Sequence, residues 1–144
     1  DKDIIEKIAG FYGSQAICIM VDYKKINNEI RLYSCCGTKL EKITLTKHLD
    51  SLNILSCGEI ILNSIDNDGN AAGIDLTILN DIGTAIDKPI LIMGGAGKPE
   101  PLSSALSSKR ISGVITANLF NFLGEGLKLA RNFALKQNIR LAEF

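Results

Sequence analysis

Carboxylates that follow apolar runs are the residues of this sequence best suited to chemistry. Asp22 follows the run ICIMV, while Asp66 and Asp68 follow the run IILNSI and precede Gly69. Short apolar runs of this kind predict strands that are buried on both faces. The carboxyl ends of parallel strands are where α/β folds hold their active sites. Asp22 is therefore either a general acid or base, or an ordinary loop acid beside two lysines.

The loop from Asp66 to Gly69 has two interpretations. Its D-x-D-G pattern offers two acids to a cation, but no acid follows at the offset that an EF-hand requires. The alternative is a polar turn, in which aspartate supports the backbone and glycine supplies an unusual φ. The residues alone leave both interpretations open.

A glycine-rich loop joins a predicted strand over 89–93 to a predicted helix over 99–107. Its members are Gly94, Gly95, Ala96 and Gly97. Such a loop lets the backbone approach a phosphate and points N–H groups at it, although a tight turn has the same composition. Thr116, Ala117 and Asn118 end the last predicted strand and offer a second set of donors. Barrel enzymes often bind phosphate between the loops after their last two strands.

Glu59 opens the strand that ends before Asp66. Period-two alternation puts Glu59, Ile61 and Asn63 on one face of that strand. If this face is the interior of a barrel, the carboxylate guards the barrel floor, at the end opposite the chemistry. The plain alternative is a salt-bridged residue that contributes only to stability.

The elements that position these residues alternate between helix and strand. Helices are expected at 4–9, 44–55, 76–86 (capped by Asp75), 99–107 and 125–137, and strands at 16–21, 29–35, 59–65, 89–93 and 111–117. Asn27 and Asn28 predict a hairpin turn after the first strand. Otherwise the alternation indicates parallel strands joined by right-handed crossovers. Four such units fit a small open sheet or half of a (β/α)8 barrel, which needs about 250 residues.

Composition and charge exclude several classes of protein. The 144 residues are 46% hydrophobic, and 16 basic residues balance 16 acidic ones, so no nucleic-acid or membrane-surface footprint is expected. No apolar run approaches the ~20 residues of a spanning helix. Four cysteines and one histidine lack metal-ligand spacing, and reduced thiols in the cytoplasm fit best. The start without Met, inside a helical pattern, indicates a piece of a longer protein.

The motifs together resemble a known family. GSQAICIMVDYKK, GEIILNSIDNDG, PILIMGGAGK and ITANLFNF are similar, in order and spacing, to the cyclase subunit of imidazole glycerol phosphate synthase. The resemblance runs over the whole chain and covers the carboxyl-terminal half of that family's barrel. It implies an α/β fold in which residues 1–144 form one (β/α)4 half-barrel domain, with a hairpin inserted after the first strand.

The resemblance also implies a reaction and its partners. Ammonia from a glutamine amidotransferase subunit, docked at the barrel floor, reaches a bisphosphorylated ribulosyl imidazole carboxamide at the top. The products are imidazole glycerol phosphate and an aminoimidazole carboxamide ribotide, formed without metal or organic cofactor. Asp22 matches an acid/base aspartate, and Glu59 matches a member of the ammonia gate. The substrate-loop positions are Asp66, Asp68 and Gly69, and the matching phosphate positions are Gly95, Ala117 and Asn118. We expect Gly94, Gly95, Ala96 and Gly97 to hold one phosphate together with Ala117 and Asn118.

Some positions depart from the family, and two alternatives stay open. Asn63 stands where the family usually has threonine, while Met93 and Asn118 replace serines. The form NSIDNDG also resembles cyclase-like paralogues that deliver ammonia for amidation of a surface polysaccharide sugar. A half-barrel by itself lacks the second aspartate and the other phosphate site. We therefore expect the isolated chain to be inactive and to associate with the missing half or with itself.

Overall fold

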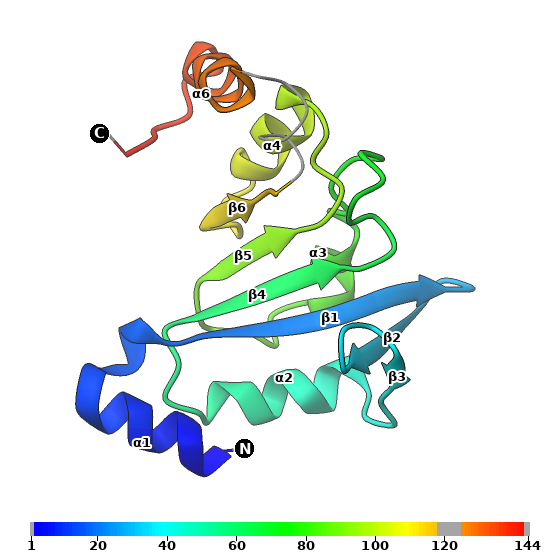
Figure 1. Ribbon diagram of the computed structural model, residues 1–144, viewed down its shortest axis with the longest axis vertical. Helices are drawn as coiled ribbons and strands as arrows, with labels where there is room; N and C mark the ends of the chain where they lie inside the picture. The colour runs from blue at the N-terminus through cyan, green and yellow to red at the C-terminus, as the bar shows by residue number, and fades with distance from the viewer. Residues whose placement is uncertain (1, 118–124, 143–144) are drawn as a thin grey trace.

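The computed structural model describes residues 2–117 and 125–142, which form an α/β structure around one sheet (Figure 1). The elements in chain order are α1 (Lys2–Tyr12), the 3-10 turn η1 (Ser14–Ala16), β1 (Cys18–Ile26), β2 (Glu29–Ser34), β3 (Lys39–Leu40), α2 (Leu45–Asn53), β4 (Glu59–Ser64), α3 (Ile78–Ile82), β5 (Ile90–Met93), α4 (Pro99–Leu106), β6 (Gly113–Ile115) and α6 (Gly126–Lys136). The predicted alternation of helices and strands is confirmed.

The sheet has six strands in the order β3-β2-β1-β4-β5-β6. β1, β4, β5 and β6 pair in parallel, whereas β2 pairs antiparallel with both β1 and β3. Asn27 and Asn28 join β1 to β2 with φ of 50° and 63°, a region that asparagine tolerates better than most residues. The prediction of an α/β fold with a mostly parallel sheet is confirmed, and the sheet is compatible with a partial TIM barrel.

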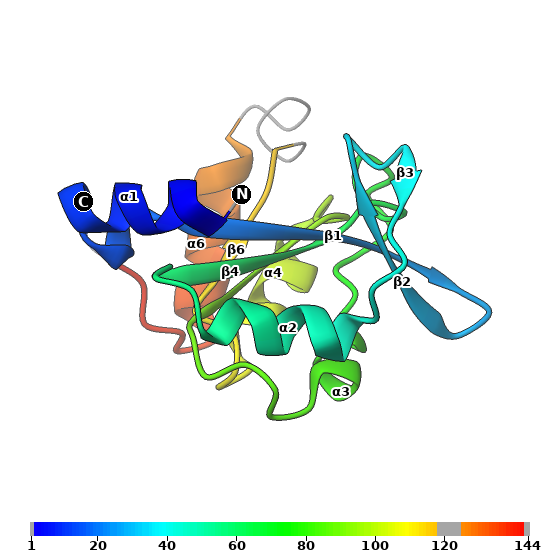
Figure 2. The same cartoon turned by 90° about the horizontal axis from the view of Figure 1, so that it is seen from below.

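Helices cover one face of the sheet and leave the other open. Ile60 and Leu62 of β4 are fully buried and belong to one core with Leu49 of α2 and Ile78 of α3. Figure 2 shows α2 and α3 on the same side of β1 and β4. We call this the helix face. The alternate residues point to what we call the open face, where Met20 is 47% exposed.

Register aligns the open face into rows. In a parallel sheet, paired residues have side chains on the same face. The first row is Cys18 and Glu59; the second is Met20, Ile61, Leu91 and Gly113; the third is Asp22, Asn63, Met93 and Ile115. An apolar row therefore separates Cys18 and Glu59 from the row that holds Asp22 and Asn63.

The predicted helix over 76–86 is too long. Only Ile78–Ile82 is helical, and its N-cap position is Thr77. The carboxylate of Asp75 accepts the backbone N–H of Thr77 at 3.0 Å, which closes a local turn instead of capping a helix. β3 also lies between the strand predicted at 29–35 and the helix predicted at 44–55, where no strand was predicted; its two residues pair with the end of β2.

Candidate functional site

A small, shallow pocket lies at the carboxyl ends of three parallel strands. Its lining comes from the loop after β4, the end of β5 with the loop after it, and the end of β6 with the loop after it. The lining residues are Asp68, Gly69, Ala71, Met93, Gly94, Gly95, Ala96, Ile115, Thr116 and Ala117. Six of these were predicted as site residues from positions up to 49 residues apart in the chain. The fold thus brings the predicted substrate loop and the predicted phosphate loop together.

Two glycines let the loops approach each other. Gly94 and Gly95 have φ of 101° and 90°, values that strain other residues. A Cβ on Gly94 would collide with the carbonyl oxygen of Ser64, and one on Gly95 with the carbonyl oxygen of Gly73. The Gly73 N–H also donates to the Gly95 carbonyl oxygen at 2.8 Å. Backbone packing alone therefore requires glycine at both positions, whether or not a ligand binds.

Side chains fix the rest of the pocket. The Asn67 amide donates to the Gly73 carbonyl oxygen at 3.2 Å, and the Thr116 hydroxyl donates to the Ala96 carbonyl oxygen at 3.4 Å. α4 begins at Pro99, shortly after the glycine loop, and the amino end of a helix favours an anion. Asp68 brings negative charge to the same pocket. A phosphorylated ligand would fit best if Asp68 met a hydroxyl or N–H of the ligand rather than its phosphate.

Asp22 and Asn63 form a second polar feature beside this pocket. They are register partners on β1 and β4, and the Asn63 Nδ2 donates to the Asp22 Oδ1 at 2.8 Å. Asn63 is only 6% exposed, and its Oδ1 is buried without a hydrogen-bond partner among the residues that the structure describes. Sequence alternation put Asn63 on the face of Glu59, but only the register reveals its bond to Asp22. Met93 follows in the same row and lines the pocket.

Besides Asp22, three predicted residues lie outside the pocket lining, and one more is not described. Asp66 forms an ion pair with Lys24 (3.6 Å between Oδ1 and Nζ) and lines a different surface hollow. Gly97 packs closely against Ala71, and Glu59 lies at the far end of β4. Asn118 falls outside the described residues.

Glu59 has a partner on the neighbouring strand. The Cys18 thiol donates to the Glu59 Oε2 at 3.2 Å. This hydrogen bond, more than the slight burial, raises the pKa of the Cys18 thiol. The carboxylate is thus held at the amino end of the open face, about 13 Å of strand below Asn63 at ~3.3 Å per residue.

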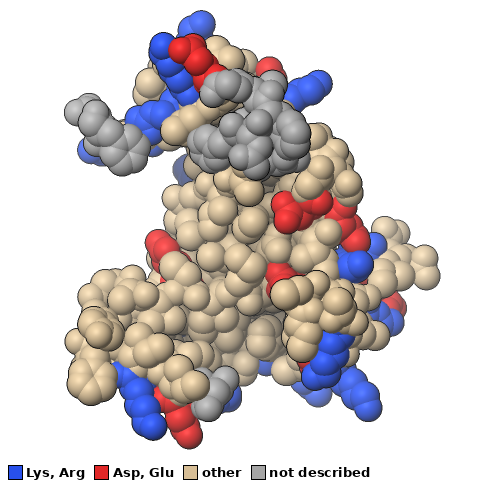
Figure 3. Space-filling view, viewed as in Figure 1, with Lys and Arg blue, Asp and Glu red and all other residues tan. Residues whose placement is uncertain are grey.

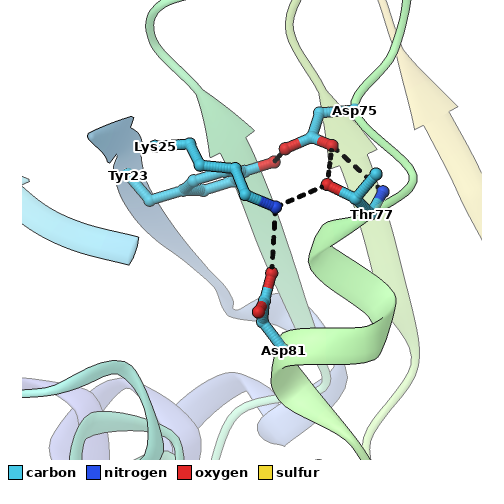
Figure 4. Close-up of polar contacts among 5 residues, drawn as sticks. All are labelled: Tyr23, Lys25, Asp75, Thr77 and Asp81. Carbon is cyan, nitrogen blue, oxygen red and sulfur yellow. Dashed lines mark hydrogen bonds and ion pairs between the residues drawn. The ribbon is translucent and has the colours of Figure 1, made fainter. Parts of the chain in front are cut away.

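A polar cluster on the helix face ties β1 to the end of the loop after β4 (Figure 4). The Tyr23 hydroxyl donates to the Asp75 Oδ2 at 3.3 Å, and the Lys25 Nζ donates to the Thr77 Oγ1 at 2.9 Å. Lys25 also pairs with Asp81 at 3.5 Å. The sequence predicted Asp75 only as a helix cap, because the spacing of local residues cannot reveal a tyrosine 52 positions earlier.

The open face is poor in charge. Figure 3 shows a largely uncharged surface across the middle of the molecule, interrupted by a few acidic side chains. Among residues 2–117 and 125–142, no three His, Cys, Asp or Glu side chains gather as a metal site. Within the same residues, no helix has the length and apolar character needed to cross a bilayer.

Comparison with known proteins identifies the family. A family model described as "Histidine biosynthesis protein" matches residues 1–125. The chain belongs to this family. Within it, the resemblance to the cyclase subunit is confirmed by relatives that carry the name of that subunit. Imidazole glycerol phosphate synthase subunit HisF from Chlorobium phaeobacteroides is 30% identical over 141 residues, which cover 98% of this chain and 56% of the relative.

Two further members of the family give the same picture. A protein named as imidazole glycerol phosphate synthase subunit hisF2 from Parasynechococcus marenigrum is 33% identical over 94% of this chain and 50% of its own length. The HisF subunit from Prosthecochloris aestuarii is 29% identical over 95% of this chain and 55% of its own length. The chain spans about half the length of the curated relatives that it matches.

Proposed function

We propose that this chain is the carboxyl-terminal (β/α)4 half of a cyclase-type (β/α)8 barrel, and that residues 1–144 form one domain of it. Two open sheet edges support this arrangement. β2 pairs only with residues 22–26 of β1, and no described strand pairs with the outer edge of residues 18–21 or with the far edge of β6. Unpaired edges of this kind call for another strand. A preceding half-barrel would pair with both edges and cover the open face.

The proposed reaction is the one that the named relatives catalyse in histidine biosynthesis. Ammonia from a glutamine amidotransferase subunit enters at Glu59, crosses the apolar row and reaches the substrate near Asp22. The bisphosphorylated ribulosyl imidazole carboxamide is then cyclised and cleaved to imidazole glycerol phosphate and the aminoimidazole carboxamide ribotide. The observation that carries this proposal is the polarity of the open face, with a carboxylate at each end and an apolar row between them.

Each predicted residue has a role in this proposal. Asp22 is the acid/base residue, Asp68 and Gly69 contact the substrate, and Asp66 supports their loop through Lys24. One phosphate lies against the backbone of the glycine loop. The residues that hold it are Gly94, Gly95, Ala96, Gly97, Ala117 and Asn118. The chemistry that we propose needs no metal or organic cofactor, and the free cysteines of the described part fit a reducing cytoplasm.

The decisive experiment is ammonia-dependent turnover of the imidazole-pathway substrate by the full-length protein. Asp22→Asn keeps the shape of the side chain but removes its acid/base function, so we expect kcat to fall by roughly 10²–10⁴-fold. Asp50→Asn, at an exposed position on α2, is the matched control and should be fully active. Full activity of Asp22→Asn would remove Asp22 from the mechanism.

A paralogous activity has two observations in its favour. Met93, a bulky side chain, lines the pocket where the family usually has serine, and Asn63 replaces the usual threonine beside Asp22. Both changes fit a protein that delivers ammonia for amidation of a surface polysaccharide sugar. Turnover assays with both acceptors, under the same ammonia supply, distinguish the two activities. Activity on the imidazole-pathway substrate alone would exclude the paralogous one.

A non-catalytic assembly remains the proposal for the chain without its preceding half. The open face and open edges would then pair two copies. We expect dimers or larger assemblies by light scattering at micromolar concentration, and no turnover. A monomeric mass would contradict this proposal, and restoring the missing half tests whether catalysis returns.

A further inference from the structure

Asn63 is a buried amide whose two polar atoms have different environments. Its Nδ2 is engaged with Asp22, while its Oδ1 has no partner among the described residues although the residue is only 6% exposed. Buried carbonyl oxygens are normally hydrogen-bonded, and leaving one unpaired costs free energy. Such an atom indicates a donor that the described chain does not supply.

The orientation of the amide follows from the chemistry of its neighbour. An ionised Asp22 accepts hydrogen bonds and cannot donate them. The opposite orientation would set the Asn63 oxygen against the carboxylate, acceptor against acceptor. Nδ2 therefore faces Asp22, and the planar amide turns Oδ1 away from it. The free acceptor and the carboxylate then lie side by side in the same row of the open face.

The position of this row defines the donor. Below it, Met20, Ile61 and Leu91 form an apolar row that separates Asn63 from Glu59 and Cys18. Apolar surroundings penalise charged and extensively hydrated species, so they favour a small neutral molecule. Asn63 is the first polar side chain that such a molecule meets on β4 above Glu59. Neutral ammonia is small, and its three N–H groups match an unpaired carbonyl oxygen.

We propose that Asn63 receives ammonia beside Asp22. Its Nδ2 holds the carboxylate in place, and its Oδ1 accepts one N–H of the ammonia molecule, which fixes the nitrogen next to the acid/base residue. The proposal rests on the proposed ammonia-using reaction and adds a residue that discriminates for ammonia. Met93 follows Asn63 in the row, and its unbranched side chain can swing aside to admit the ligand.

The first test measures KM for ammonia and for the phosphorylated substrate separately, in the full-length protein. Asn63→Leu keeps the volume but removes both hydrogen bonds, and we expect KM for ammonia to rise roughly tenfold, the effect of one lost hydrogen bond. KM for the phosphorylated substrate should change by less than about twofold if binding there is independent. Asn63→Thr, which restores a hydroxyl acceptor, should recover most of the loss. Asp50→Asn, at an exposed position on α2 away from the open face, is the control.

A structural role would give a different result. If Asn63→Leu raised both KM values equally, or lowered kcat with both KM values unchanged, the proposal would be wrong. A failure of Asn63→Thr to recover ammonia affinity would also count against it.

The second test does not depend on turnover. The side-chain amide resonance of Asn63 in the full-length protein is followed by NMR while ammonium chloride is added at alkaline pH, with potassium chloride as the matched salt. A saturable shift with ammonium alone supports the proposal, and equal shifts with both salts, or none, overturn it. If wild-type protein showed this shift but no turnover, the proposed reaction would fail and the ammonia site would stand.

Discussion

The two faces of the sheet are built from alternate residues of the same strands, yet they differ in burial. On β4, Ile60 and Leu62 are fully buried under α2 and α3, whereas Ile61 between them is only partly covered. On β1, Val21 is 3% exposed and its neighbour Met20 is 47% exposed. Within one strand, aliphatic side chains of similar size are thus buried in the core on one face and partly exposed to solvent on the other.

This difference separates folding from function. The helix face supplies the burial that holds this chain together, because side chains at 0% exposure contribute most to the hydrophobic term. The open face carries the polar pair of Asp22 and Asn63. Below this pair lies the apolar row, where Met20 is 47% exposed and Ile61 is partly exposed, and this row contributes little to stability until something covers it. Mutations on the two faces should therefore divide into effects on stability and effects on activity.

The largest expected effect is a core truncation on the helix face. Leu62→Ala should lower the free energy of unfolding by about 3 kcal/mol, since it leaves a cavity in a packed core. Ile61→Ala, one residue earlier on the open face, should cost about 1 kcal/mol or less in this chain because its side chain is already partly exposed. Urea unfolding followed by circular dichroism measures both.

The same pair of variants tests the half-barrel proposal. In a full-length protein whose open face is covered, the cost of Ile61→Ala should approach that of Leu62→Ala. An unchanged small cost for Ile61→Ala in the longer protein would mean that this face stays uncovered.

The second effect concerns the edge where the two faces meet the loops. Gly95→Ala should destabilise the chain by about 1–3 kcal/mol, because φ is 90° and the new Cβ would collide with the Gly73 carbonyl oxygen. Gly69→Ala is the matched variant, with φ of 77° and open space around the new Cβ, so we expect only about 1 kcal/mol. Equal losses of unfolding free energy in the two variants would show that the contact with Gly73 does not contribute to the difference.

The sequence predicted the helix face well because burial follows local patterns. The apolar runs before Asp22 and Asp66 predicted two strands, and helical spacing predicted a helix over 44–55, where α2 lies with Leu49 fully buried. Turn chemistry located the β1–β2 connection. Each of these signals lies within about ten residues of the chain, so no knowledge of the tertiary structure was needed.

The site was only half predictable, because its details depend on contacts across the sheet. Strand ends predicted that Asp68 and Gly95 would meet, but the bond between Asn63 and Asp22 depends on a register that no local pattern encodes. The helix predicted over 76–86 was too long, and its predicted cap was wrong for the same reason, since a distant tyrosine and a local turn both engage the Asp75 carboxylate.

The third effect is the loss of the tyrosine hydroxyl on the helix face. Tyr23→Phe removes the hydrogen bond to Asp75 and should cost about 1 kcal/mol. Burial, and then the charge of Asp75, raise the pKa of Tyr23 above its usual value near 10. The folded state therefore keeps its proton longer, and stability that is fully present below about pH 10 falls as the pH rises above it.

Urea midpoints measured from neutral to alkaline pH test both parts of this prediction. Tyr23→Phe should start lower and lose less stability with rising pH, because it has no phenol to ionise. Tyr12→Phe, at a residue that is 71% exposed, should behave as wild type. If wild type and Tyr23→Phe showed parallel alkaline losses, another group would be responsible.

The smallest effect lies at His48 on α2, which is half-buried. Burial lowers the pKa of its imidazole, an effect that the nearby charge of Glu41 partly offsets. The unfolded chain then binds a proton more readily, so stability present above pH 6.5 declines as the pH falls below it. Solvent screening limits the loss to about 0.5 kcal/mol or less. His48→Gln should flatten the decline in urea midpoint between neutral and mildly acid pH, while Lys47→Gln should leave it unchanged. Titration of this helix-face residue would then change stability without changing the candidate site. That result would agree with the expected division between effects on stability and effects on activity.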